Sequence, residues 1–107
     1  MKHVAFFGDG KHPFALTDTL IAELERKANL GIGALYLRCV QMAFQLSDLT
    51  EIIRLGLIGG GASPERAAQL TDTYAKDRPI EELYPLAVDI LQARWSGAAH
   101  TEEAPND

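Results

Sequence analysis

The chain has 107 residues, of which 47% are hydrophobic and 23% are charged, and it carries 10 basic and 15 acidic side chains. This length suits one compact domain, and the composition is that of a globular protein rather than a disordered or fibrous one. The formal net charge of −5 and the scattered basic residues argue against binding to nucleic acid through its phosphate backbone.

Cys39 is the only cysteine, so no disulfide can form within the chain, and a cytosolic protein is the simplest interpretation. The apolar N-terminal run meets Gly8 and Asp9 too early to form the core of a signal peptide. No apolar run approaches the roughly 18 residues that a membrane span requires. We therefore expect a protein that is neither secreted nor inserted in a membrane by signals of its own.

The first sixteen residues predict a small β-hairpin. Two short apolar runs, Val4–Phe7 and Phe14–Leu16, flank the dipeptide Asp9-Gly10. Asp-Gly is favoured in two-residue hairpin turns, because both turn positions need a positive φ. With this turn, Phe7 would lie opposite His12.

From residue 17 onward the spacing of the apolar residues is helical. Thr17 or Asp18 can cap a first helix, and Gly31 is suited to end it. A second helix, over about residues 33–46, is apolar on nearly every side, with its polar residues in one narrow stripe. Such a helix is expected either at the centre of the core or beneath a partner.

Three further helices are predicted. Ser47-Asp48 is a typical start for the third helix, which runs into the glycines at 59–61. Ser63-Pro64-Glu65 provides the serine cap, the proline at the first helical position and the first-turn acid of a fourth helix. The last helix ends near Trp95, and Pro85 should break or kink it near its first turns. The predicted fold class is mainly α: a small N-terminal β-hairpin followed by a compact bundle of four to five helices.

We expect a single domain over residues 1–97, with the hairpin in residues 1–16 and the helices in residues 17–97. Residues 98–107 contain three acids, no base and a proline, which predicts a flexible acidic tail. This tail supplies −3 of the net charge of −5, which leaves −2 for residues 1–97. The folded part is therefore close to neutral.

The run Gly59-Gly60-Gly61 differs from a phosphate-binding loop, because no lysine follows it and the segment before it is helical. We interpret Gly59, Gly60, Gly61 and Pro64 as a structural loop between two helices, in which only glycine fits the backbone angles.

No group of residues indicates catalysis. Cys39 has no histidine near it in sequence that could activate its thiol. In the predicted hairpin His3 and His12 lie too far apart to share a metal ion, and the third histidine, His100, falls in the tail. The acidic pairs are better explained as solvated helix surfaces than as paired acid and base catalysts. We therefore expect no enzyme, no cofactor and no metal site.

Residues 48–61, together with Ser63-Pro64 and Ala67, resemble the central signature of a family of small tail proteins of phages and gene transfer agents. Its most specific part is Arg54–Pro64, where a helix ends in R-x-G-L-I-G-G-G and a proline-started helix follows. The order of the predicted elements matches that family over residues 4–97. The family is described as a tail assembly chaperone and, under older naming, as a gene-transfer-agent tail tube protein.

The resemblance implies a non-enzymatic role in building a phage-like tail. As a chaperone, the protein would bind the tape-measure protein during tail assembly in the bacterial cytoplasm. The alternative is a structural component that stays in the tail of the particle. Both roles imply tail proteins as partners, with a homo-oligomer as a further option, and neither calls for nucleic acid or a membrane. The surplus of apolar residues indicates a partner surface, for which we nominate four residues: Leu35, Val40, Phe44 and Leu57.

Overall fold

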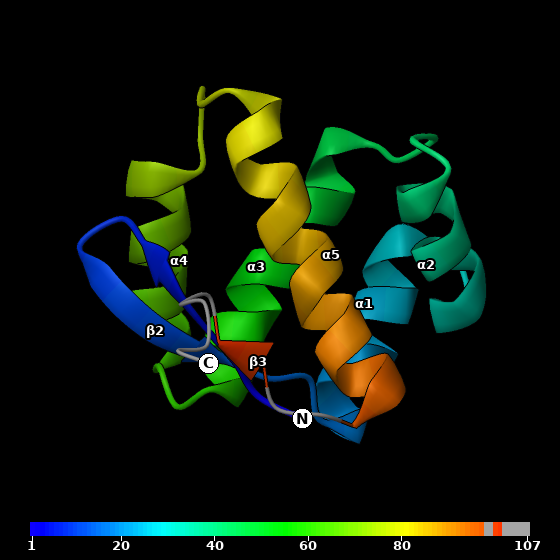
Figure 1. Cartoon of the computed structure of the whole chain (residues 1–107), viewed down its shortest axis with the longest axis horizontal. Helices are drawn as coiled ribbons and strands as arrows, with labels where there is room; N and C mark the ends of the chain where they lie inside the picture. Colours follow the sequence, from blue (N-terminus) through cyan, green and yellow to red (C-terminus); the bar gives the residue numbers. More distant parts are fainter. Residues whose placement is uncertain (98–99, 102–107) are drawn as a thin grey trace, which may run out of the picture.

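The computed structural model of the protein describes residues 1–97 and 100–101 (Figure 1). The strands are β1 (His3–Phe7), β2 (Gly10–Phe14) and β3 (His100–Thr101). The helices in these residues are α1 (Asp18–Ala28), α2 (Ile32–Val40), α3 (Leu46–Gly59), α4 (Pro64–Tyr74) and α5 (Ile80–Ser96). The predicted fold class, an N-terminal hairpin followed by a bundle of four to five helices, is confirmed.

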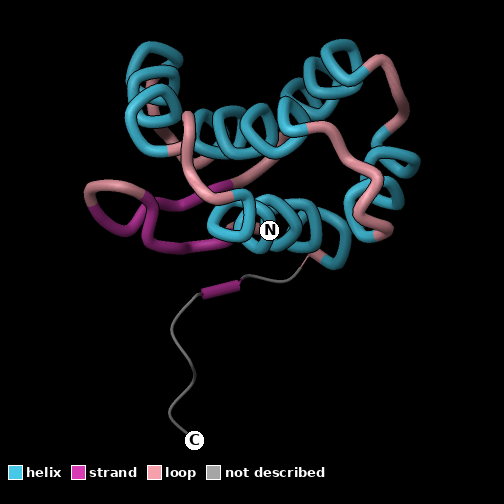
Figure 2. Tube along the Cα trace, turned by 90° about the horizontal axis from the view of Figure 1, so that it is seen from above, coloured by secondary structure: helices cyan, strands magenta, loops and turns pink. Residues whose placement is uncertain are grey.

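Helix α3 is the central element of the fold. It contacts α1, α4, α5 and β2, while the hairpin and α4 lie at one end of the long axis and α1 and α2 at the other (Figures 1 and 2). The sequence left open whether the second helix is the central one, and the structure gives that place to α3. Its buried side chains belong to a single core cluster that also includes residues from the hairpin, α1, α2, α4 and α5: Leu49, Ile52, Ile53, Leu55 and Leu57.

Helix α2 is shorter than predicted and lies at the edge of the bundle. It ends at Val40 instead of near residue 46, because Met42 adopts a left-handed φ of 63°. The amide of Ala43 then donates a hydrogen bond (2.9 Å) to the carbonyl of Arg38, which closes the helix end. Only two of its side chains, Leu35 and Cys39, are fully buried.

Side-chain caps explain two of the predicted helix starts. The hydroxyls of Thr17 and Ser63 accept hydrogen bonds from backbone amides in the first turns of α1 and α4, as expected. Helix α1 ends within the predicted break, residues 29–33, but the predicted capping residue, Gly31, was wrong. Asn29, with a left-handed φ of 56°, ends this helix, and Gly31 instead precedes the first residue of α2.

Pro85 does not break the last helix, because α5 is continuous from Ile80 to Ser96. A proline lacks the N–H that would bond to the carbonyl four residues earlier, which here belongs to Glu81. Pro85 and Glu81 are both exposed. Water can therefore solvate the free carbonyl, and the helix tolerates the proline.

The hairpin turn lies one residue earlier than predicted. Phe7 pairs with Gly10 rather than with His12, so the two turn residues are Gly8 and Asp9. Only Gly8 has a positive φ, of 70°, which is the glycine placement of a type II′ turn. The predicted pairing differs from the observed one by two residues, which leaves the same side chains facing the core.

Strand β1 is the middle strand of a small sheet with the order β2-β1-β3. Strand β3 runs parallel to β1 and places the backbone of His100 beside that of His3. The sequence did not predict this strand. The rest of the expected acidic tail, at residues 98–99 and 102–107, lies outside the described residues.

The end of α3 packs backbone against backbone on the connection between β2 and α1. A Cβ atom at Gly59 would overlap the carbonyl oxygen of Ala15, and one at Gly60 would overlap the carbonyl oxygen of Pro13. Gly60 has an ordinary helical φ of −82°, so its backbone angle does not require glycine. The reason for these two glycines is therefore space, and not the backbone angle that the sequence suggested.

Gly61 is different, because its φ of 120° lies in a region that side chains rarely allow. It leads the chain out of α3 into the loop before Pro64, which is the first residue of α4. In this loop the backbone angle does call for glycine.

We predict that Gly60→Ala destabilises the protein by about 1–3 kcal/mol or more, because the carbonyl oxygen of Pro13 belongs to the backbone and cannot turn aside. The matched control is Gly33→Ala in α2, where an added Cβ has nothing within 4 Å. There alanine should raise the stability by about 0.5–1 kcal/mol. Urea unfolding measures both changes, and equal stabilities of the two variants would contradict the close approach.

Candidate partner-binding surface

An apolar surface lies on the outer side of α2 and continues through the turn that follows to the first residue of α3. Four large apolar side chains within ten residues are between 46% and 66% exposed. Single exposed apolar residues are common on proteins, but such a concentration is typical of a surface that another molecule covers. We call these four residues the α2 face: Leu37, Val40, Met42 and Leu46.

The α2 face carries no charge. Residues 39–47 contain no charged side chain, and Arg38 is the only charged residue of α2. Burying an unpaired charge is costly, whereas an uncharged face can be covered by an apolar surface without that cost. The face therefore suits an apolar partner segment.

Contacts inside the bundle turn the polar groups of α2 away from this face. Nη2 of Arg38 lies 2.8 Å from Oδ1 of the buried Asp48. The other carboxylate oxygen of Asp48 accepts a hydrogen bond (2.8 Å) from the amide of Gln45, at the start of α3. The hydroxyl of Tyr84 on α5 donates to the carbonyl of Cys39 (3.0 Å). These bonds fix which side of α2 faces outward.

The structure separates the four nominated partner residues. Val40 is exposed on the α2 face, and Phe44 is half-buried with its ring stacked on that of Tyr84, at 5.2 Å between the ring centres. Leu35 and Leu57 are fully buried in the core, where a partner cannot reach them in the folded protein.

Sequence reasoning did not nominate Leu37, Met42 or Leu46. A helix that is apolar on nearly every side gives no periodic signal for which side faces outward. The one available signal was the absence of charge over residues 39–47.

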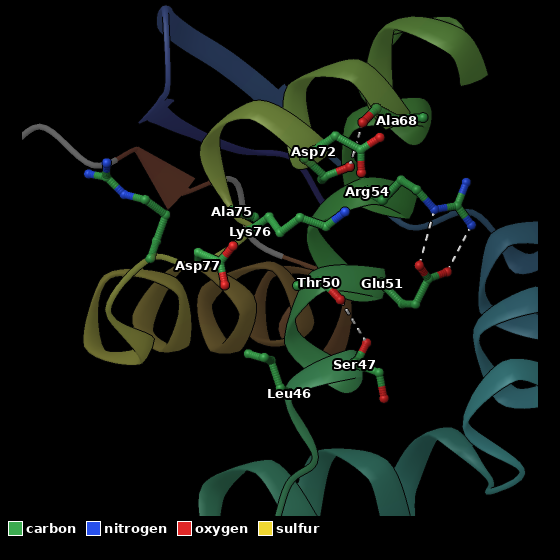
Figure 3. A pocket seen from close by; sticks show the side chains of 12 residues that line it. Leu46, Ser47, Thr50, Glu51, Arg54, Ala68, Asp72, Ala75, Lys76 and Asp77 are labelled. Carbon is green, nitrogen blue, oxygen red and sulfur yellow. Dashed lines mark hydrogen bonds and ion pairs between the residues drawn. The ribbon is translucent and has the colours of Figure 1, made fainter.

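A groove of about 390 Å³ lies between α3 and α4, with Leu46 of the α2 face at its rim (Figure 3). Small side chains such as Thr50 and Ala68 leave it open. The guanidinium of Arg54 is turned to Glu51, with N–O distances of 2.8 and 3.2 Å, so its charge is paired. Neither a histidine nor a cysteine is among the described residues that line the groove.

Within residues 1–97 and 100–101, no group of three or more His, Cys, Asp or Glu side chains is arranged to hold a metal ion. No helix in the described part of the chain is long and apolar enough to cross a membrane.

Comparison with known protein families gives a match over residues 1–97, to the family described as "Phage tail tube protein, GTA-gp10". The chain belongs to this family. The resemblance seen in the sequence is thus confirmed at the level of a tail protein of phages and gene transfer agents, a family of structural or assembly proteins. No curated protein and no solved structure matches the chain.

In this tail-family protein, Cys39 holds the inner side of α2 in the core. Burial and, to a smaller extent, the nearby Asp48 carboxylate raise the pKa of the Cys39 thiol from 9.0 to about 11, against a lowering by the charge of Arg38. At neutral pH the thiol is therefore protonated, which makes it a poor nucleophile. Its role is to pack against the core.

We expect the buried thiol to make stability depend on pH above 9. The unfolded chain releases the Cys39 proton near pH 9.0, whereas the folded protein keeps it until about pH 11. Between these values the unfolded state binds fewer protons, so the free energy of unfolding falls as the pH rises, by at most about 1.4 kcal/mol per pH unit. Urea unfolding of the protein and of Cys39→Ala, below pH 9 and near pH 11, should show this part of the decline only in the unsubstituted protein.

Proposed function

We propose that this tail-family protein acts without catalysis, as an assembly chaperone that binds an apolar helical segment of the tape-measure protein through the α2 face. The observation that carries this proposal is the uncharged, half-exposed row of side chains on α2 and the turn after it. A chaperone of this kind would act in the bacterial cytoplasm, before the particle is complete.

The physical basis is burial of apolar surface on both partners. Removing apolar area from water contributes about 25 cal/mol per Å² to both partners, and the complex is stable where this gain exceeds the entropic cost of association. A helix that lies in an apolar groove or on an apolar face is a common mode of recognition. The α2 face offers such a surface, and its nearest charge, Arg38, is already paired with Asp48.

A second candidate is a structural component of the tail, and the description of the family as a tail tube protein favours it. A ring built by pairing strands from neighbouring subunits needs long strand edges. In the described residues the strands have five, five and two residues. This small sheet favours the chaperone over a tube subunit that assembles through its strands.

We predict that Leu37→Asp prevents binding of the tape-measure segment, because it places a charge on the α2 face. Co-expression followed by co-purification should show at least a tenfold loss of the complex. The matched control is Phe6→Asp, which changes another exposed apolar residue, on β1 at the opposite end of the long axis from α2 (Figure 1). Equal losses with both variants, or none with either, would contradict the use of the α2 face.

The composition of purified particles distinguishes the two candidates. For a chaperone, quantitative mass spectrometry should find this protein far below one copy per tube subunit. A stoichiometric amount in intact tails would overturn the chaperone proposal and favour the structural one.

A further inference from the structure

A pocket of about 220 Å³ opens where α2 packs beside the C-terminal end of α5. The rings of Tyr36 on α2 and Trp95 on α5 line it, with 5.0 Å between their centres. Trp95 is 62% exposed, although tryptophan is the largest apolar side chain that a fold can bury. Four aliphatic side chains line the rest of the pocket: Leu16, Ile21, Ile32 and Leu91.

The size of the pocket limits what it can hold. Pockets for drug-sized ligands measure about 300–1,000 Å³, and an apolar cavity of about 150 Å³ can hold one benzene ring. A pocket of about 220 Å³ therefore suits one bulky aliphatic or aromatic side chain.

Of the described residues that line the pocket, only Arg94 is charged, and it is already paired within the protein. Nη1 of Arg94 donates to the carbonyl of Leu16 (2.8 Å), and Nη2 lies 2.6 Å from Oδ1 of Asp18. A charged side chain in the pocket would lose its hydration without gaining a partner. The charge pattern thus selects an apolar occupant.

The pocket is continuous with the α2 face. Tyr36 and Val40 are four residues apart on α2, so they are neighbours on the same side of the helix. A helix that covers Val40 and Leu37 can therefore reach the pocket with one of its own side chains.

Two other occupants could come from this chain itself. The residues outside the described structure, 98–99 and 102–107, are Ala-Ala and Glu-Glu-Ala-Pro-Asn-Asp, and none has a bulky apolar side chain. A second copy related by a two-fold axis would have to fill each pocket with an exposed side chain of the other copy, and a measurement of self-association tests this occupant.

We infer that the Tyr36–Trp95 pocket receives one bulky aliphatic or aromatic side chain of the partner helix, while the α2 face covers the neighbouring apolar side chains. This inference rests on the proposed function, because it concerns the same bound segment. Tryptophan, tyrosine and arginine are enriched among the few residues that dominate binding energy at interfaces.

The experiment uses the full chain and overlapping peptides of about 20 residues that tile the tape-measure protein of the same particle. Binding is measured by the fluorescence anisotropy of labelled peptides. Trp95 is the only tryptophan of the protein, so its emission reports directly on the pocket if peptides without tryptophan are used. We expect binding to shift this emission to shorter wavelength and to protect it from acrylamide quenching.

Trp95→Ala and Tyr36→Ala should each weaken binding by at least about 30-fold. The matched control, Ile80→Ala, should change the affinity less than about twofold, since Ile80 is exposed but distant from the pocket. Circular dichroism and the urea midpoint of each variant verify the fold. Replacing the inserted peptide residue by alanine should weaken binding to the unsubstituted protein but not further weaken binding to Trp95→Ala.

The failures of the two proposals give different results. If Leu37→Asp abolishes binding while Trp95→Ala binds normally and Trp95 emission does not change, the pocket is not used and the α2 face still is. If no peptide binds the unsubstituted protein, both proposals are overturned. Self-association that Tyr36→Ala abolishes would overturn this inference in favour of an interface between copies of the chain.

Discussion

The fold depends on a backbone-to-backbone approach between the C-terminal end of α3 and the connection from β2 to α1. Gly59 and Gly60 bring α3 against the carbonyl groups of Ala15 and Pro13 at distances that leave no room for a Cβ atom. The amide of Ala15 also donates to the carbonyl of Gly56 (3.0 Å). This contact joins the hairpin, the first helix and the central helix at one point, so that no one of them can shift alone.

The positions of the other helices are consistent with this contact. With its end held against the hairpin, α3 is surrounded by α1, α4 and α5, which bury its apolar side chains on several sides. The short α2 is left at the edge and buries only Leu35 and Cys39. Its outer side therefore keeps apolar side chains in contact with water, and this is the surface through which we propose that the protein binds its partner.

The polar groups near α2 keep that outer side uncharged. Asp48 binds Arg38 and the first turn of α3 at once, and it does so in the interior, where an unpaired charge would be costly. The single cationic side chain of α2 is thus removed from the surface that a partner would cover. A second arginine is paired in a similar way at the pocket beside Trp95. The guanidinium of Arg94 donates hydrogen bonds to the carbonyl of Leu16 and to the carboxylate of Asp18.

The sequence by itself determined the features that depend on neighbouring residues. The helix starts at Thr17 and Ser63 rest on side-chain hydrogen bonds within one turn, and the string from Arg54 to Pro64 was enough to indicate the tail family. Only the tertiary structure decided the features that depend on distant segments. It shows that α2 ends at Val40, that Leu37 faces outward while Leu35 is buried, and that Gly59 and Gly60 serve a close approach. The physical reason is that hydrogen bonds within a turn form between near neighbours, whereas the outward side of an apolar helix is set by what packs against its other side.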